Sequence, residues 1–234
     1  MRLIRIFLFF SLSLFFIIKK GNCQYNENKI FQVRIAPLNA FTPNAEVLQW
    51  GMQKRFNQRL ALAADYGFKF RTFSLGSKNG GRLNYHYYTA KGEVKYFFAL
   101  RQNKRSGFTN PYFSIQGFYF PQKYDNKNGW LYLNNKSYHY DRSTITRNVA
   151  VSSLLIGDEH VTKRMVIDYY IGAGVRKITI HHHNTIGAVE GRRSFPAEIG
   201  GGIRIDEKEG NFYRPHLALG FKLGYILNKK QQPK

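Results

Sequence analysis

The stretch Pro215–Leu227, which reads P-H-L-A-L-G-F-K-L-G-Y-I-L, decides the fold. Its alternate positions are large and apolar: Leu217, Leu219, Phe221, Leu223, Tyr225 and Leu227. The positions between them are mostly small or polar, and successive side chains of a strand point to opposite faces. One face of this strand is therefore apolar along its length. The same pattern in further long strands behind an export signal favours a membrane barrel whose apolar face meets lipid.

The first 23 residues have the three parts of an export signal. Basic Arg2 and Arg5 precede an apolar run, Ile6–Ile18, and a polar segment that ends at Cys23. The run is shorter than the ~20 residues that a membrane-spanning helix needs. We expect cleavage after Cys23; acylation of Cys23 is the alternative, although Asn22 replaces the Gly, Ala or Ser of such sites. Residues 24–234 then form a single outer-membrane domain.

Composition excludes several classes of function and favours certain partners. Cleavage removes the sole cysteine, which excludes disulfides, thiolate catalysis and Cys-ligated metals. No later segment approaches ~18 consecutive apolar residues, so no transmembrane helix is expected. The formal charge of +22 is spread along the chain. In an exported protein this favours anionic lipid and lipopolysaccharide phosphates over nucleic acid as partners.

Period-2 alternation and turn residues predict an antiparallel, up-and-down transmembrane β-barrel of eight strands, with ten strands as the alternative. In the sixth strand we expect Val149, Val151 and Leu155 to face outward. The expected strands are Ile30–Pro37, Ala45–Phe56, Leu60–Arg71, Lys91–Ala99, Pro111–Phe120, Ser143–Ile156, Arg164–Arg176 and Pro215–Leu227.

The expected connections separate into two groups, and only the first one, Leu38–Asn44, breaks the contrast between them. The short ones are Asn57–Arg59, Leu100–Asn110 and Gly157–Lys163, and the long ones are Thr72–Ala90, Pro121–Arg142 and Lys177–Arg214. Short periplasmic turns opposite long extracellular loops are typical of outer-membrane barrels. A further hairpin within Arg192–Ile205 would give the ten-stranded alternative.

Charged residues occupy the face of the strands opposite to the apolar one. Buried charges must be paired or wetted, so we expect an ion-pair network in the barrel interior. The surplus of cations predicts trapped water or anions as well. The expected members are Arg34, Arg55, Asp65, Lys69, Glu93, Lys95, Asp168, Arg176 and Lys222.

Three segments carry a resemblance to known proteins: Phe31–Leu38 (FQVRIAPL), Met165–Arg176 (MVIDYYIGAGVR) and the closing strand. They resemble small outer-membrane β-barrels of the OmpA/OmpX-like superfamily. Within the closing strand, Ala218–Tyr225 is similar to the insertion signal that the outer-membrane assembly machinery reads, through Gly220, Leu223 and Tyr225. The segment departs from that signal at Ala218 and in the tail that follows Tyr225. The resemblance implies the fold and the location, and such barrels serve many functions.

A run of three histidines is the clearest metal candidate. His181 and His183 share a face of an extended segment and could chelate zinc or copper, with Glu190 or Glu198 as a further ligand. A polar loop is the favoured interpretation, so we expect neither a metal nor a cofactor. Gly200–Gly202 is interpreted as a loop hinge, because no Walker lysine follows it.

The residues for an enzyme are present but lack a linking motif. Lipid A deacylases and acyltransferases of this architecture use His, Ser and an acid near the outer rim. The nominal parts here are His139, His160, Ser152, Ser153, Asp141 and Asp158. We therefore expect no catalysis, with a lipid-modifying enzyme as the first alternative and a soluble lipocalin-like barrel as the second.

Aromatic runs remain in the expected long loops. Tyr85–Tyr88, Trp130–Tyr132 and Tyr138–Tyr140 could contact sugars or a partner, or could continue the strands beyond the membrane. The sequence thus predicts a non-enzymatic integral outer-membrane protein that acts as a structural or interaction subunit. Its expected partners are outer-membrane lipid, lipopolysaccharide, the assembly machinery and other outer-membrane proteins in a complex.

Overall fold

The computed structural model describes residues 30–37, 47–69, 82–98, 101–103, 107–133, 136–162, 164–191 and 207–227. These residues form strands almost throughout and contain no α-helix, which confirms the all-β fold class. The predicted signal peptide with Cys23, together with Glu198 and Gly200–Gly202, lies outside the described residues. The strands are β1 (Phe31–Ala36), β2 (Val47–Arg55), β3 (Leu60–Lys69), β4 (Arg82–Phe97), β5 (Arg101–Asn103), β6 (Gly107–Leu133), β7 (Lys136–Thr162), β8 (Met165–Ile186), β9 (Val189–Glu190) and β10 (Gly210–Ile226).

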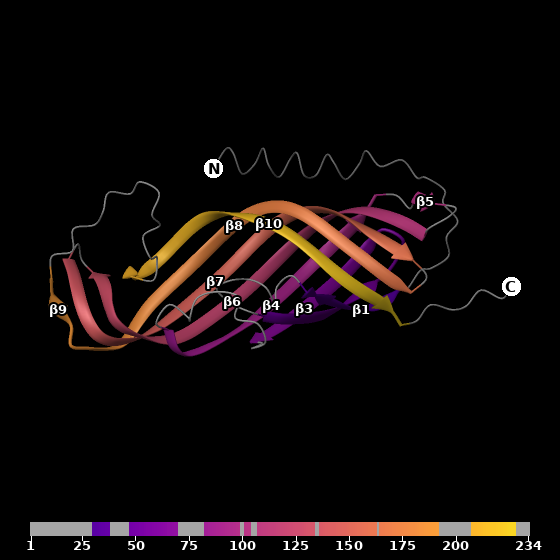
Figure 1. The fold of residues 1–234 in the computed structure, drawn as a ribbon. Helices are drawn as coiled ribbons and strands as arrows, with labels where there is room; N and C mark the ends of the chain where they lie inside the picture. Colours follow the sequence, from indigo (N-terminus) through magenta and orange to yellow (C-terminus); the bar gives the residue numbers. More distant parts are fainter. Residues whose placement is uncertain are drawn as a thin grey trace, which may run out of the picture.

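The strands close into a ring. Antiparallel pairing runs through β1, β2, β3, β4, β6, β7, β8 and β10, and β10 returns to β1 between Gln32↔Ile226 and Ile35↔Leu223. Of the ten described strands, eight therefore belong to the ring, while β5 pairs only with β6 and β9 only with β7. Figure 1 shows the long strands running obliquely, with β5 and β9 near opposite ends.

Alternation of side chains gives the ring two different faces. In β3, Ala61, Ala63 and Asp65 are buried inside the ring, while Leu62 and Tyr66 are exposed outside. The turn before β3 is held by Asn57, whose Oδ1 accepts hydrogen bonds of 2.8 Å from the backbone nitrogens of Arg59 and Leu60. This is the local bonding that makes Asn favourable in a tight turn.

The facing expected for the sixth strand is wrong. Val149, Val151 and Leu155 of β7 are buried, whereas Leu154 and Ile156 are exposed. The segment Val151–Ile156 carries apolar residues at both parities, so alternation alone does not orient it. The register with β6 and β8 decides the facing, because Leu155 then packs in an inner cluster with Tyr112 and Tyr170.

Much of the expected long loops is strand. Pro121–Leu133 continues β6, Lys136–Arg142 begins β7, and Lys177–Ile186 continues β8. The last pair between β8 and β10 is Gly210↔Ile180, so the strands beyond it are no longer closed by β10. We call this part the distal extension: residues 82–86 of β4, 123–133 of β6, 136–146 of β7 and 181–186 of β8. The aromatic runs predicted in the loops lie in strands, mostly in this extension.

Three asparagines with left-handed backbone lie in the distal extension. Asn84, Asn128 and Asn184 each have φ of 50°. The ladder skips residues at Asn84 and near Asn184, where the register between neighbouring strands shifts. Asparagine tolerates this conformation better than most residues, and such bulges bend and twist a strand. The sequence therefore sets the point at which the extension departs from the regular ring.

Candidate functional site

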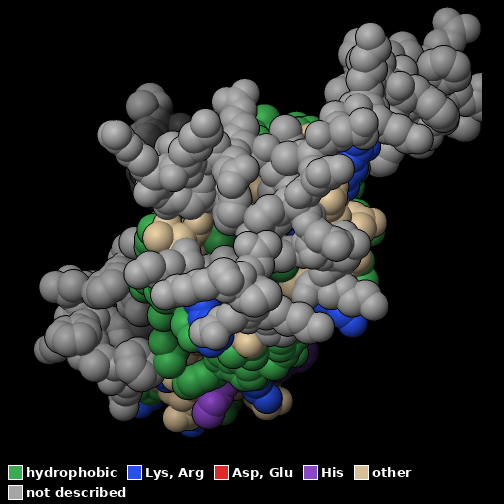
Figure 2. Space-filling view, turned by 90° about the vertical axis from the view of Figure 1, so that its right-hand side faces the viewer, with side chains coloured by type: hydrophobic (Ala, Val, Ile, Leu, Met, Phe, Trp, Pro, Cys, Tyr) green, Lys and Arg blue, Asp and Glu red, His purple; other side chains and the backbone are tan. Residues whose placement is uncertain are grey.

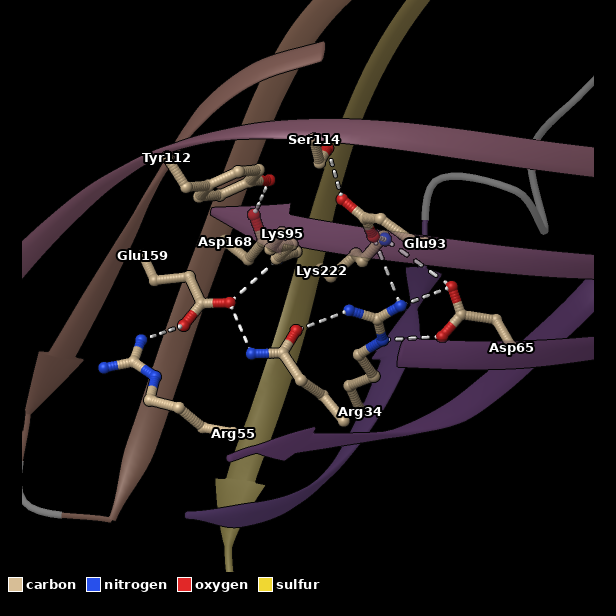
Figure 3. Close-up of polar contacts among 11 residues, drawn as sticks. Arg34, Arg55, Asp65, Glu93, Lys95, Tyr112, Ser114, Glu159, Asp168 and Lys222 are labelled. Carbon is tan, nitrogen blue, oxygen red and sulfur yellow. Dashed lines mark hydrogen bonds and ion pairs between the residues drawn. The ribbon is translucent and has the colours of Figure 1, made fainter. Parts of the chain in front are cut away.

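The interior of the ring contains a buried cluster of charged side chains. Its members come from β1, β2, β3, β4, β7, β8 and β10, each from a position whose neighbours in the strand face outward. Figure 3 shows these side chains converging on one level of the interior. Because every strand of the ring except β6 contributes a charge, the site exists only when the ring is closed.

Arg34 and Lys222 form one half of the cluster. Arg34 binds Asp65 through two hydrogen bonds, with Nε–Oδ1 of 2.6 Å and Nη2–Oδ2 of 2.9 Å. Lys222 Nζ lies 2.9 Å from Glu93 Oε2 and 3.5 Å from Asp65 Oδ2. A bidentate pair of this kind fixes both partners, since the guanidinium fork matches the carboxylate. This half therefore links β1 and β10 to β3 and β4.

Lys95 and Glu159 form the other half. Lys95 Nζ lies 2.8 Å from Glu159 Oε1 and 2.6 Å from Asp168 Oδ2, and Arg55 Nη2 lies 3.3 Å from Glu159 Oε2. Arg55 also stacks on Phe97, with its Cζ 3.8 Å from the ring centroid. These contacts tie β2 and β4 to β7 and β8.

Neutral side chains complete the cluster. Gln53 joins the two halves, because it accepts from Arg34 Nη1 at 2.9 Å and donates to Glu159 Oε1 at 2.7 Å. The Tyr112 hydroxyl donates to Asp168 at 2.7 Å and the Ser114 hydroxyl donates to Glu93 at 2.8 Å. Every carboxylate thus receives at least two donors, which is the condition under which buried charge is tolerated.

The cluster is electrically balanced. It contains four cations and four carboxylates: Arg34, Arg55, Lys95 and Lys222 with Asp65, Glu93, Glu159 and Asp168. Their side chains are nearly inaccessible to solvent; that of Lys95 is 0% exposed. Each carboxylate is engaged by cations, so the arrangement locks strands together and fills the interior rather than offering a reactive group.

The structure brings together seven of the nine residues expected in this network and places two elsewhere. Lys69 is exposed, and its Nζ donates to the backbone oxygen of Tyr85 at 2.7 Å. Arg176 faces the interior at a different level and makes no ion pair with any described carboxylate. The expectation that Lys69 and Arg176 join the network is therefore wrong, because they lie four and eight residues beyond the network carboxylates Asp65 and Asp168 along β3 and β8.

Sequence reasoning missed Glu159, Gln53, Tyr112 and Ser114. The expected sixth strand ended at Ile156, three residues before Glu159, and its facing was inverted. With β7 continued to Thr162 and the correct parity, Glu159 falls on the inner face together with Ser153 and Leu155. Because the expected strand ended too early, Glu159, the acid that binds both Lys95 and Arg55, was not predicted.

The histidine run forms no metal site in the described part of the chain. His181 and His183 share a face of β8, with ring centroids 6.2 Å apart, and both are exposed. Within the described ranges, no group of three or more His, Cys, Asp and Glu side chains could hold a metal ion. Glu190, one expected third ligand, instead pairs with Lys136 at 3.0 Å.

The nominal enzyme residues are dispersed. Ser152 faces outward and Ser153 inward on β7, whereas His139 lies beside Trp130 in the distal extension, with ring centroids 5.3 Å apart. Asp158 lies toward the opposite end of β7 and accepts from the Tyr169 hydroxyl at 3.1 Å. The arrangement expected of a hydrolytic Ser–His–acid set is not formed by these residues.

Gly220, Leu223 and Tyr225, which resemble the insertion signal, lie in the C-terminal half of β10. Tyr225 is exposed on the outer face, and its hydroxyl accepts from Arg164 at 3.3 Å. Gly220 lies against the ring of Tyr170, where a larger residue would collide. Leu223 is half-buried.

Comparison with known proteins gives no relative: no family model, no curated protein and no solved structure matches the chain. Among the described residues, no helix is long and apolar enough to cross a membrane.

Proposed function

We propose that the protein is an integral outer-membrane β-barrel that acts as a non-enzymatic structural or interaction subunit. The observation that carries the proposal is the polarity of the ring, which is inverted relative to a soluble protein. Charged side chains fill the interior, while Leu217 and Leu219 outside are each 75% exposed. An apolar exterior of this extent marks a surface that meets lipid or protein. A lipocalin-like barrel would require the opposite polarity.

The outer apolar side chains form rows that continue across several neighbouring strands of the ring. One row in register is Leu62, Val94, Ile115, Leu154, Ala173 and Leu217. Figure 2 shows hydrophobic side chains forming a patch on one face, with basic and histidine side chains at its margin. Rows that continue from strand to strand are what a lipid-facing band requires, and they support this role for the outer face.

Aromatic side chains lie at both ends of this band. Tyr66, Tyr88 and Tyr119 are neighbours at the distal end, with centroids 5.9 and 6.5 Å apart. At the other end, Tyr96 and Phe113 flank Phe98 at 6.1 Å each. The eight residue steps from Tyr88 to Tyr96 span about 20 Å of height at a tilt of roughly 40°. Two aromatic clusters at such a separation support a membrane-spanning band.

The distal extension is the part available for contacts outside the membrane. It presents exposed Lys123, Lys127, Lys136 and Arg142 together with half-buried aromatics such as Trp130 and Tyr132. The interior offers no wide passage at the level of the ion-pair network, and an eight-stranded ring is narrow. Basic and aromatic groups suit contact with lipopolysaccharide phosphates or with another outer-membrane protein. The proposed function of the protein is therefore to bind partners through the distal extension.

The membrane assignment is tested by a matched pair of β10 variants. Leu219→Arg places a charge against lipid and should cost about 2–4 kcal/mol near the midplane, whereas Ala218→Ser faces the interior and should be nearly silent. Folding is measured by the shift between unheated and boiled samples in SDS electrophoresis, and location by membrane fractionation. Unchanged insertion of Leu219→Arg, or recovery of the unmodified protein in the soluble fraction, would refute the assignment.

The interaction role is tested by removing the tip of the extension. Deleting residues 127–142 and joining Asn126 to Ser143 through Asn-Gly retains the existing Asn126↔Ser143 pair at the head of a two-residue hairpin. A second variant keeps the hairpin and replaces exposed Lys127 and Lys136 by Gln, which separates the contribution of these charges from that of the hairpin as a whole. We expect the deletion to insert normally but to lose co-purifying lipopolysaccharide or partner protein. Unchanged co-purification would remove the extension from the proposal.

A further inference from the structure

Buried polar atoms without partners lie in the ring beyond the ion-pair network. The Gln116 amide nitrogen and the hydroxyls of Ser153 and Thr89 form no hydrogen bond among the described residues. The three side chains are only 6%, 2% and 5% exposed. Native interiors rarely leave several buried polar atoms unpaired, so such a group indicates something bound there.

The register places the Gln116 and Ser153 side chains along one band of the inner wall. Gln116 is paired with Ser153, Ser153 with Gly174, and Gly174 with His216. Cross-strand partners carry their side chains on the same face, here the interior. A Cβ at Gly174 would lie 2.6 Å from Ser153 Oγ, so the glycine leaves open the space in front of that hydroxyl.

The adjacent inner row carries cations. In register order it consists of Lys91, Phe118, Val151, Arg176 and Arg214, and Arg176 lies directly opposite Arg214. Arg176 Nε is buried and donates to no acceptor in the described part of the chain. Lys91 Nζ lies 5.1 Å from the Phe118 ring centroid, and the described residues offer it no ion-pair partner within 4 Å. Arg176 lies two positions from Gly174, the partner of Ser153, and Lys91 lies two positions from Glu93, the partner of Gln116, so both cations border the band of unpaired donors.

The neighbouring carboxylates are already neutralised. Glu93 is paired in register with Gln116, yet it is bound by Ser114 at 2.8 Å, Lys222 at 2.9 Å and Arg34 at 3.4 Å. Asp65 is held by Arg34 at 2.6 Å. The balanced network therefore has no spare acid for the cations above it. Like charges that lie together without an acid beside them favour a bound counter-ion.

We propose that this region of the interior binds a tetrahedral oxyanion of the phosphate class. Arg176 and Lys91 supply the charge, and Gln116 with Ser153 supplies neutral donors. An anion with several oxygens accepts from all of these groups at once, and guanidinium is particularly suited to phosphate. Because Arg176 and Lys91 are positively charged, they would repel a metal ion from this site. The inference concerns the ring interior, so it does not depend on the proposed membrane location.

The test uses the full mature protein, purified without phosphate or sulfate and titrated calorimetrically with inorganic phosphate. Arg176→Gln should weaken binding about tenfold or more, because a hydrogen bond to a charged group is lost. Lys177→Gln is the matched control, since it removes the neighbouring cation on the exposed outer face. Ser153→Ala serves as a second, conservative variant, and circular dichroism verifies the fold of each. Phosphoethanolamine is titrated in parallel as a headgroup mimic.

Weaker phosphate binding by Arg176→Gln and Ser153→Ala, with Lys177→Gln unchanged, supports the site. Binding of phosphoethanolamine as well identifies a lipid headgroup as the source, and its failure beside phosphate identifies a free anion. If Arg176→Gln does not fold, Ser153→Ala decides. Absence of phosphate binding to the unmodified protein, or equal binding by the folded inner-face variants, overturns the proposal and leaves water as the partner of these donors.

Discussion

Replacing Glu159 by Gln removes one charge from the buried network while preserving side-chain volume. Glu159 accepts from Gln53 at 2.7 Å, Lys95 at 2.8 Å and Arg55 at 3.3 Å, so the variant leaves four cations with three carboxylates. Breaking a buried pair in this way costs about 3–5 kcal/mol. Lys95 keeps Asp168 at 2.6 Å, and Arg55 keeps its stacking on Phe97. We therefore expect a loss near the lower limit, about 3 kcal/mol of unfolding free energy.

The measurement is urea unfolding in lipid vesicles, followed by tryptophan fluorescence and analysed by linear extrapolation. Asp158→Asn is the control, because this neighbouring carboxylate is bound by Tyr169 at 3.1 Å in an exposed contact, outside the network. The unfolding free energy of Asp158→Asn should lie within about 0.5 kcal/mol of that of the unmodified protein.

A double variant with Lys95→Met separates the ion pair from simple loss of packing. Since removal of both partners leaves no uncompensated charge at this contact, the two changes should be less than additive. The idea that a balanced charge network holds the ring closed would be refuted if the Glu159→Gln protein were as stable as the unmodified one. Strictly additive losses of unfolding free energy in the double variant would refute it as well.

Two further predictions concern packing and pH. Gly172→Ala should destabilise the ring by about 1–3 kcal/mol, because its Cβ would collide with the carbonyl oxygen of Leu154 on the next strand, whereas Gly117→Ala meets open space and should be silent; equal urea midpoints would contradict this. Asp125 in the distal extension accepts from an arginine, a threonine and an asparagine, which lowers its pKa from 3.8 to about 2. Because the pKa is lower in the folded state, the stabilisation is present above about pH 4 and is lost as the pH falls through about 2. Trp130 fluorescence should report that loss in the extension, and Asp125→Asn should abolish the transition; a transition that persists in the variant would exclude this carboxyl as its cause.

Much of the inner face could be predicted because the strands are regular. Arg34, Asp65 and Lys222 alternate with apolar neighbours, so period 2 places them inside once a closed ring is assumed. The same reasoning failed at β7, where apolar residues occupy both parities between Val151 and Ile156. There the local pattern is degenerate, and only pairing with β6 and β8 fixes the register.

The sequence by itself determined the all-β class, the two faces of the clean strands and the presence of a charged interior, because these depend on the local alternation of side chains. The partners of each charge depend on distances across the ring, such as that from Arg34 to Asp65 or from Lys95 to Glu159. Strand tilt and register set those distances, and neither can be read from one strand alone. For the same reason only the tertiary structure separated the balanced network from Arg176, which makes no ion pair among the described residues.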